Sequence, residues 1–424
     1  MILKNNYFQN KVLSNSIFSL AQQGITLLIN LLIFSIIGKH FGPIIFGQYS
    51  FATTISSFIA LPLALGINIP IYRAIAKKNK KANVYLINGL ILRYIGMLIL
   101  LPLLTLMVAY LMRIDYLALT SIVAWYVGLN SIFSFYQGSF LSLNKTAYNF
   151  ILTVILKLMQ LAVVYLVLND FTKLFIFFNC LILINIFFAH YTLNKFIPIN
   201  LDNLKGKINY RFACKLIIIS FPLIISAFSE FLNLKIDQLF LGLMTTEKTL
   251  GLYSSATYIY FALTLLPLTL TQVFFTNFIM YFHTSAKSAF KFFNQYMSLF
   301  GFYSFLMILL IYITSDQIIN FMYGKDFILA SKILFILSFS IPFVIMNRLS
   351  NAAINALGFY SYTSKIILIG SLINIALNII LIPYFNAYGA VYATIFTEAI
   401  VLLLGLAKIN IEKNKILKLN SKLL

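Results

Sequence analysis

Long apolar stretches separated by short polar segments dominate the chain. Twelve of them reach the roughly 20 residues needed to cross a bilayer. The first six are Leu13–Ile37, Ile44–Ile69, Val84–Met112, Tyr116–Phe140, Ala147–Leu168 and Phe171–Ile197. The second six are Leu216–Met244, Leu252–Met280, Tyr296–Thr314, Ile333–Leu357, Ile366–Ile382 and Ala390–Leu406. Because the stretches lack period-two alternation, they predict helices rather than barrel strands, hence an all-α polytopic membrane protein.

Composition supports this fold class and narrows the function. Of the 424 residues, 61% are hydrophobic and 10% are charged, against about 45–50% and about 25% in soluble domains. A water-soluble fold and a conventional soluble enzyme are therefore excluded. Three His, two Cys and ten acids are scattered, with no phosphate-binding loop and no metal-ligand spacing. We expect no enzyme activity, no cofactor and no metal site.

The net charge of +21 is distributed unevenly across the predicted spans. With the N-terminus inside, and with Lys173 and Lys195 at the two ends of the sixth span counted with the adjoining loops, the inner loops and tails hold 21 of the 31 Lys and Arg, the outer loops hold six and the spans hold four. This asymmetry predicts that both termini are cytoplasmic. The first helix lacks a signal-peptide layout, so we expect it to be a retained span. Nucleic-acid binding is disfavoured because no basic soluble domain is present.

The two halves of the chain share a repeated motif. FGQYSFATTI at Phe46–Ile55 and LGLYSSATYI at Leu250–Ile259 share six identities at an offset of 204 residues. Six spans separate the copies, so both halves insert in the same orientation. The sequence predicts two six-helix lobes, residues 1–205 and 206–424, related by a parallel repeat. Alternating access between the lobes is the mechanism we expect.

Seven Lys, Arg, Asp and Glu residues lie away from the ends of the predicted spans, where such groups are costly and often functional. The cations are Arg93, Lys157, Lys235 and Arg348, and the acids are Glu230, Asp237 and Glu398. A mildly cationic interior suits an anionic substrate, because Arg grips phosphate through two parallel hydrogen bonds. The acids are candidates for a proton or cation site. Snorkelling cations or buried structural ion pairs are alternative interpretations of the same residues.

Four stretches resemble the polysaccharide biosynthesis protein family, and in particular the O-antigen (Wzx-type) flippases of the multidrug/oligosaccharidyl-lipid/polysaccharide (MOP) exporter superfamily. They are GKHFGPIIFGQYSFA from Gly38, LGINIPIYRAIAKK from Leu65, IDQLFLG from Ile236 and LNIILIPYFNAYGAVYATIFTE from Leu377. Asn378, Pro383, Gly389, Ala390 and Thr394 sit in the last stretch as the family has them, and Asp237 resembles the family's acid in helix seven.

The resemblance implies a flippase that moves undecaprenyl-pyrophosphate-linked oligosaccharide repeat units from the cytoplasmic to the periplasmic leaflet. It implies a bacterial inner (plasma) membrane location, a role in O-antigen and lipopolysaccharide synthesis, ion coupling, and a polysaccharide polymerase as partner. The four in-span cations become substrate-binding candidates, and Glu230, Asp237 and Glu398 become ion-coupling candidates.

Two other functions remain open at this stage. A multidrug or cation exporter of the same superfamily is expected to line its cavity with acids, whereas the in-span cations outnumber the in-span acids here. A membrane-embedded O-antigen polymerase or ligase resembles this chain in composition. Such enzymes carry one long periplasmic loop, however, and the longest outer loop predicted here is short and lacks His.

Overall fold

The computed structural model describes residues 2–64, 67–77, 82–112, 117–167, 170–197, 212, 214–216, 218 and 235–420. Every regular element within these ranges is a helix. Ten helical segments there are long and apolar enough to cross a membrane. The predicted all-α polytopic membrane fold is confirmed.

The chain divides into two compact units. The first comprises Met1–His40 and Gln48–Phe228, and the second comprises Phe41–Gly47 and Ser229–Leu424. The boundary predicted between residues 205 and 206 lies outside the described residues and stays a prediction.

The helices of the first unit account for its predicted spans. In chain order they are α1 (Ile2–Ala64, apart from the segment at Phe41–Gly47), α2 (Asn68–Ala76), α3 (Ala82–Ile95), the π-helix η1 (Gly96–Leu100), α4 (Leu101–Met112), α5 (Leu117–Ser142), α6 (Thr146–Leu166) and α7 (Phe171–Asn194). Their shared core contains apolar side chains of α2, α3, α5 and α7, such as Ile71, Leu86, Phe135 and Ile182. This core fixes α2 against α3 and α5.

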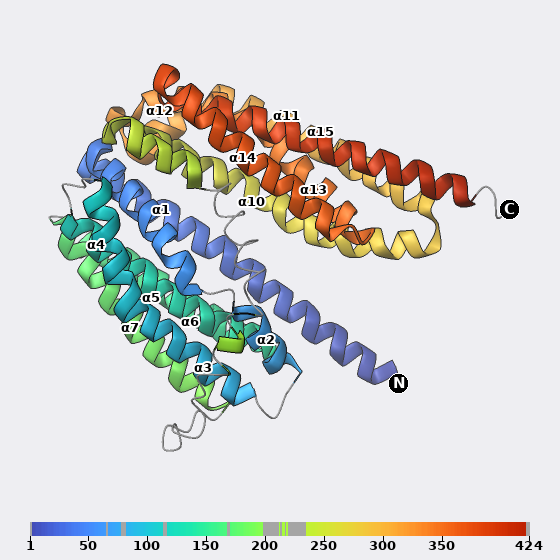
Figure 1. Ribbon diagram of the computed structural model, residues 1–424, viewed down its shortest axis with the longest axis horizontal. Helices are drawn as coiled ribbons and strands as arrows, with labels where there is room; N and C mark the ends of the chain where they lie inside the picture. The colour runs from blue at the N-terminus through green and yellow to red at the C-terminus, as the bar shows by residue number, and fades with distance from the viewer. Residues whose placement is uncertain are drawn as a thin grey trace. The chain divides into compact units, whose positions relative to one another are not determined.

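Helix α1 contains two predicted spans rather than one. A straight helix of its 63 residues would be about 95 Å long, far more than a bilayer requires. The backbone leaves the helical region at Gly42, where φ is 74° and ψ is 177°. Glycine allows this positive φ because it has no Cβ. The chain reverses direction at this point (Figure 1).

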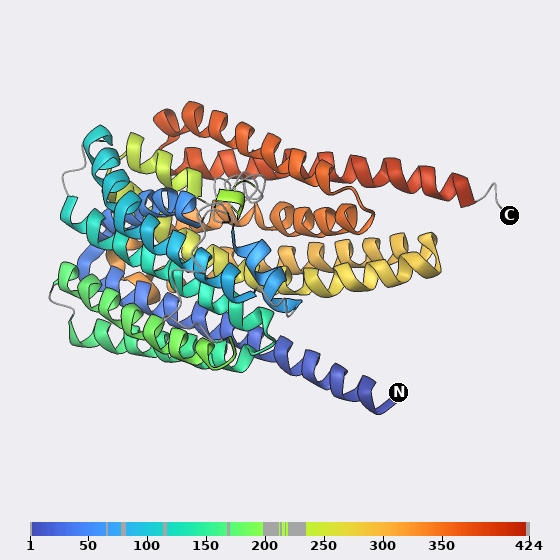
Figure 2. The same cartoon turned by 60° about the horizontal axis from the view of Figure 1, so that its bottom comes forward.

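After Phe41–Gly47, the described part of the second unit resumes with a helical stretch at 235–244. It continues with α10 (Glu247–Thr284), α11 (Ala286–Tyr323), the 3₁₀-helix η3 (Lys325–Phe327), α12 (Leu329–Ser338), α13 (Ile341–Ala356), α14 (Tyr360–Phe385) and α15 (Ala387–Asn420). Helices α10 and α11 form a long antiparallel pair, drawn in yellow to orange in Figure 2. The predicted span Leu216–Met244 lies largely outside the described residues.

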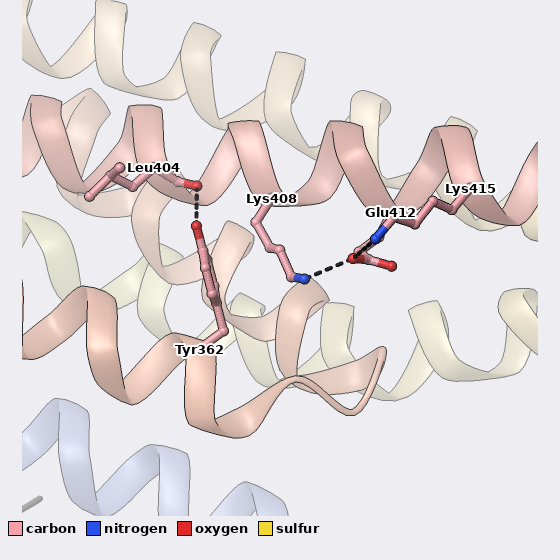
Figure 3. A network of polar contacts seen from close by, with 5 residues as sticks. All are labelled: Tyr362, Leu404, Lys408, Glu412 and Lys415. Carbon is pink, nitrogen blue, oxygen red and sulfur yellow. Dashed lines mark hydrogen bonds and ion pairs between the residues drawn. The ribbon is translucent and has the colours of Figure 1, made fainter.

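Polar contacts lie where the first turn of α14 meets the C-terminal half of α15. The Lys408 ammonium donates to Glu412 Oε1 at 2.7 Å, and Lys415 lies 3.4 Å from the same oxygen. Tyr362 donates to the Leu404 carbonyl at 3.4 Å (Figure 3). Lys408 also lies 4.1 Å from the centre of the Phe359 ring. One lysine thus interacts with both an acid of α15 and an aromatic ring that precedes α14.

The repeated motif forms a close helix contact within the second unit. A Cβ added to Gly47 would lie 1.8 Å from the Glu247 carbonyl oxygen, and one added to Gly251 would lie 2.0 Å from that of Pro43. In each case the carbonyl belongs to the residue four positions before the other glycine. Each motif glycine therefore lies against the backbone of the turn that precedes the other glycine, in the same register.

Candidate functional site

The most complete polar cluster of the second unit surrounds Asp237, which lies in the helical stretch 235–244. Asp237 Oδ2 accepts hydrogen bonds from the Tyr253 and Thr394 hydroxyls, each at 2.8 Å. Asp237 Oδ1 accepts from Asn378 Nδ2 at 2.7 Å. All three donors are neutral, so they orient the carboxylate without cancelling its charge. We call these four residues the Asp237 cluster.

Helical spacing explains how the sequence builds this cluster. Asn374 and Asn378 are one turn apart on α14, so their side chains share a face. Asn378 Nδ2 also donates to Asn374 Oδ1 at 3.0 Å, while the buried Asn378 Oδ1 has no hydrogen-bond partner among the described residues. Together with Asn374, the cluster combines a carboxylate with amide oxygens, the ligand type that hard cations prefer. No group of three His, Cys, Asp or Glu that could hold a metal occurs among the described residues.

A second acid, Glu398, lies on α15 one turn after Thr394. Glu398 accepts from the Asn347 side-chain amide, which also donates to the Glu398 carbonyl at 2.9 Å. Arg348, on the exposed side of α13, and Asp237 both interact electrostatically with the Glu398 carboxyl. The structure therefore brings together Asp237, Glu398 and Arg348, three of the residues singled out by the sequence.

Lys235 lies two residues before Asp237 in the chain but has different contacts. Its ammonium donates to Gln238 Oε1 at 2.7 Å and lies 5.9 Å from the centre of the Tyr258 ring. Gln238 in turn contacts Thr257 at 3.5 Å. The contacts of Lys235 are thus neutral polar and aromatic groups of the same unit.

Arg93 is buried in the first unit, with a side chain 2% exposed. Its Nη1 donates to the carbonyl and the hydroxyl of Ser131 on α5, at 2.7 and 2.8 Å. Its Nη2 donates to Asn68 Oδ1 on α2 at 2.6 Å, and the guanidinium lies 5.0 Å from the centre of the Phe135 ring. The side chain therefore joins three helices through neutral groups.

Lys157 belongs to a polar series along α6 in the same unit. Its ammonium donates to Gln160 Oε1 at 3.0 Å, and Gln160 donates to the Tyr126 hydroxyl at 3.3 Å. Further along the helix, Thr153 accepts from Gln137 at 2.8 Å and Asn149 donates to Gln22 at 2.9 Å. These contacts fix α6 to α5 and α1.

Sequence reasoning found some of these residues and missed others. An ionisable side chain in an apolar span is conspicuous, and this signal identifies Arg93, Lys157, Lys235, Asp237, Arg348 and Glu398. Glu230, the third acid, lies outside the described residues. The roles of Tyr253, Asn374 and Asn68 were missed, because hydroxyl and amide side chains are common in membrane helices. The i,i+4 pairs Asn374–Asn378 and Thr394–Glu398 were an available signal.

The fold is similar to that of solved membrane transporters. The lipid II flippase MurJ in an inward closed conformation matches with a TM-score of 0.71 and 18% identity, over 96% of this chain and 91% of that one. An inward-facing multidrug resistance MATE transporter of the MOP superfamily matches with 0.64 and 14%, over 94% and 96%. A MOP superfamily transporter from Pyrococcus furiosus, described as having reverse polarity in its binding pocket, gives 0.60 and 14%, over 94% and 95%. The fold is that of MOP-superfamily transporters.

Sequence comparison gives the narrower assignment. Residues 12–282 match the family described as polysaccharide biosynthesis protein, and the chain belongs to this family. An uncharacterized membrane protein, MJ1068 of Methanocaldococcus jannaschii, is 34% identical over 79 residues, which is 19% of this chain and 16% of that protein. The match spans about a sixth of this curated relative.

Proposed function

We propose that this protein is a flippase for polyprenyl-diphosphate-linked oligosaccharides, moving repeat units from the cytoplasmic to the periplasmic leaflet by alternating access. One observation carries the proposal. Arg93, Lys157 and Lys235 lie inside apolar helices, and each donates to a neutral oxygen acceptor. Cations held in this way retain their charge for an anionic substrate, and a diphosphate is such a group. Family membership and the MOP-type fold support the same assignment.

Substrate binding is assigned in this proposal to Arg93, Lys157, Lys235 and Arg348, and ion coupling to Asp237, Glu398 and Glu230. Asp237 is the strongest candidate for coupling. Its two carboxylate oxygens meet three neutral donors from three helices, and the buried Asn378 Oδ1 is available as a further ligand. A proton or a sodium ion at this carboxylate would change the packing of α10, α14 and α15 together. O-antigen, as opposed to another surface polysaccharide, is the substrate we favour from the resemblance.

The proposal also covers location and partners. The resemblance supports a location in the bacterial inner membrane, and the charge distribution supports cytoplasmic termini. The substrate is delivered from the lipid phase, and a polysaccharide polymerase is the partner expected to consume it on the outer side.

The test is the sidedness of lipid-linked oligosaccharide in cells depleted of this protein. We expect repeat units to accumulate on the cytoplasmic leaflet, with rescue by the wild type and by Lys291→Ala, which changes an exposed lysine of α11. The Arg93→Ala, Arg348→Ala double variant should reach the membrane and fail to rescue.

The outcomes separate the competing functions. Repeat units that cross normally without the protein would overturn the flippase proposal, and accumulation of a cationic dye would favour an exporter. Units that reach the periplasm and remain single would favour a polymerase. Full rescue by the double variant would reject the assigned cations while leaving the flippase proposal intact.

A further inference from the structure

Helix α15 continues well past the apolar segment that is predicted to cross the membrane. The last predicted span ends at Leu406, whereas α15 ends at Asn420, fourteen residues or about 21 Å further along its axis. Figures 1 and 2 show this C-terminal part of α15, drawn in red, projecting beyond the neighbouring helices of the second unit. We call residues 407–420 the α15 extension.

Aromatic side chains mark the level at which the α15 extension leaves the membrane. Tyr362, in the first turn of α14, donates to the Leu404 carbonyl at 3.4 Å, and the Lys408 ammonium lies 4.1 Å from the centre of the Phe359 ring. Tyr360, next to Phe359, is 61% exposed. Aromatic side chains with a polar group gather at membrane–water interfaces. The α15 extension therefore begins at the level of the lipid headgroups.

The α15 extension is strongly basic. It contains the four lysines Lys408, Lys413, Lys415 and Lys418 and a single acid, Glu412. Glu412 Oε1 accepts from Lys408 at 2.7 Å and lies 3.4 Å from Lys415, whose side chain is 64% exposed (Figure 3). Four positive charges and one negative charge leave the extension with a net charge of +3.

The spacing of these lysines favours a membrane surface over a soluble partner. The headgroup region is about 6 Å thick on each side of a bilayer, and its potential falls off over a Debye length of about 8 Å. Lys408, Lys413 and Lys415 follow Leu406 by two, seven and nine residues, and the last of these distances is about 14 Å along the axis. Three of the four lysines thus lie within reach of the headgroups.

We propose that the α15 extension and the first turn of α14 bind the phosphodiester headgroups of anionic phospholipids. The leaflet is the one at which α15 ends, which the charge distribution predicts to be the cytoplasmic leaflet. Lysines that directly follow a membrane helix attract such lipids. Lys408 is oriented for this contact by Glu412 and Phe359, and Lys415 is open to the headgroups. This inference is independent of the proposed function.

The test measures the preference for anionic lipid beside the α15 extension. Tyr360→Trp places a fluorescent reporter there, in a protein whose single native tryptophan is removed by Trp125→Phe. The full-length protein is reconstituted with brominated phosphatidylglycerol or brominated phosphatidylcholine, whose bromine atoms quench a neighbouring indole. We expect quenching to show a preference of about fivefold or more for phosphatidylglycerol at low salt. The preference should shrink in about 1 M salt, because the salt screens the lysines.

Tyr384→Trp, again with Trp125→Phe, is the matched control at the opposite end of α14. Tyr384 is 79% exposed, and residues 366–397 contain no Lys, Arg, Asp or Glu. The control reporter therefore lies on the same helix and in contact with lipid, but away from the α15 extension. We expect its quenching to show little difference between the two lipids.

Two changes in the α15 extension alter its charge in opposite directions. The Lys413→Gln, Lys415→Gln double variant removes two positive charges, so we expect the preference at residue 360 to fall towards one. Glu412→Gln removes the only acid, so we expect the preference to rise by about fivefold. A general loss of folding cannot produce this increase, and the two variants therefore separate a lipid surface from a structural role of the same residues.

Three results would overturn the lipid surface. They are equal lipid preferences at residues 360 and 384, a preference at residue 360 that does not change with salt, and a preference that falls in Glu412→Gln. The first result would leave the charges of the α15 extension to an acidic soluble partner. Because neither reporter measures translocation, a failure of the flippase proposal would leave this test unaffected.

Discussion

At the scale of single residues, Asp237 shows how a charge is kept inside an apolar unit. Three neutral donors from α10, α14 and α15 converge on its two oxygens. Each donor belongs to a different helix, so the hydrogen bonds of the carboxylate depend on the packing of all three helices. A change of its charge therefore changes the balance of contacts among the helices.

We predict that Asp237→Asn removes the dependence of translocation on an ion gradient. The amide cannot bind a proton or a cation as a carboxylate does, and its NH₂ group would face donors. Leaving one such donor unsatisfied costs about 1–3 kcal/mol. The measurement is the initial rate of substrate flipping in vesicles with imposed sodium or proton gradients.

Asp316→Asn provides the control, because Asp316 is exposed on α11 of the same unit. We expect it to keep the gradient dependence of the wild type. If Asp237→Asn responded to the gradient in the same way, coupling would have to be assigned elsewhere, with Glu398 and Glu230 as the remaining candidates.

Asp170 shows a local effect outside the membrane-spanning segments. Its Oδ1 accepts from the backbone amides of Lys173 and Thr172 and so caps α7. The Lys173 amide, and then the Thr172 amide and the Lys173 side chain, hold the pKa of this carboxyl below its ordinary value of 3.8. Ionised Asp170 therefore stabilises the folded state at neutral pH.

We predict that Asp170→Ala lowers the unfolding temperature of the protein slightly at pH 7. Because the folded-state pKa is lowered, this contribution is present above about pH 3.8 and is lost as the pH falls through the folded-state value. The difference between the variant and the wild type should thus shrink on acidification, as measured by unfolding scans between neutral and acidic pH. A difference that grew on acidification would contradict this account.

At the scale of elements, apolar stretches predicted where the spans lie but not where the helices end. Helix α11 begins at Ala286, ten residues before the predicted start of its span, because the polar segment around Lys287 and Lys291 is also helical. Hydropathy marks only the part of a helix that meets lipid. Likewise, α2 continues to Ala76, beyond the predicted end of the second span at Ile69, and so places Arg73 on a helix.

Helix interruptions were also missed by hydropathy. The tenth predicted span contains two helices, since α12 ends at Ser338 and α13 begins at Ile341 with Pro342 in its first turn. The third span contains the π-helix η1. Both stretches are apolar enough overall that hydropathy runs through the irregularity, although Pro342 was an available signal for the start of α13.

The repeated glycines support a prediction about helix contact. Gly47→Ala and Gly251→Ala each place a methyl group within 2.0 Å of a backbone carbonyl oxygen, whereas a Cβ at Gly24 meets nothing within 4 Å. We expect the first two variants to lower the unfolding temperature by several degrees and to reduce flipping, and Gly24→Ala to do neither. Equal stability of all three proteins would show that the contact between the motif copies is not required.

At the scale of the whole molecule, the charge distribution predicts the orientation in the membrane. Helix α10 has 38 residues, about 57 Å, so its ends lie on opposite sides of the bilayer. Lys248, in the first turn of α10, is predicted to lie on the outer side of the membrane. Lys287, just after the end of α10, is predicted to lie on the inner side.

This orientation is tested with Lys248→Cys and Lys287→Cys in a protein whose Cys180 and Cys214 are replaced by Ser. We expect a membrane-impermeant thiol reagent to label the first variant in intact cells and the second only after permeabilisation. The replacement is needed because both native cysteines are exposed. Labelling with the opposite pattern would reverse the assigned topology and place the termini outside.

The amino-acid sequence alone predicts the fold class, the approximate spans and the ionisable residues that stand out within them, because burial in lipid requires long apolar helices and makes every charge conspicuous. Tertiary structure decided which polar residues act together. Asp237 is joined to Asn378 and Thr394 across 141 and 157 residues of sequence, and Arg93 to Asn68 across 25. Such contacts depend on how each helix is rotated about its axis within its unit. These follow from the packing of all the helices in a unit and leave no mark in the pattern of any single stretch.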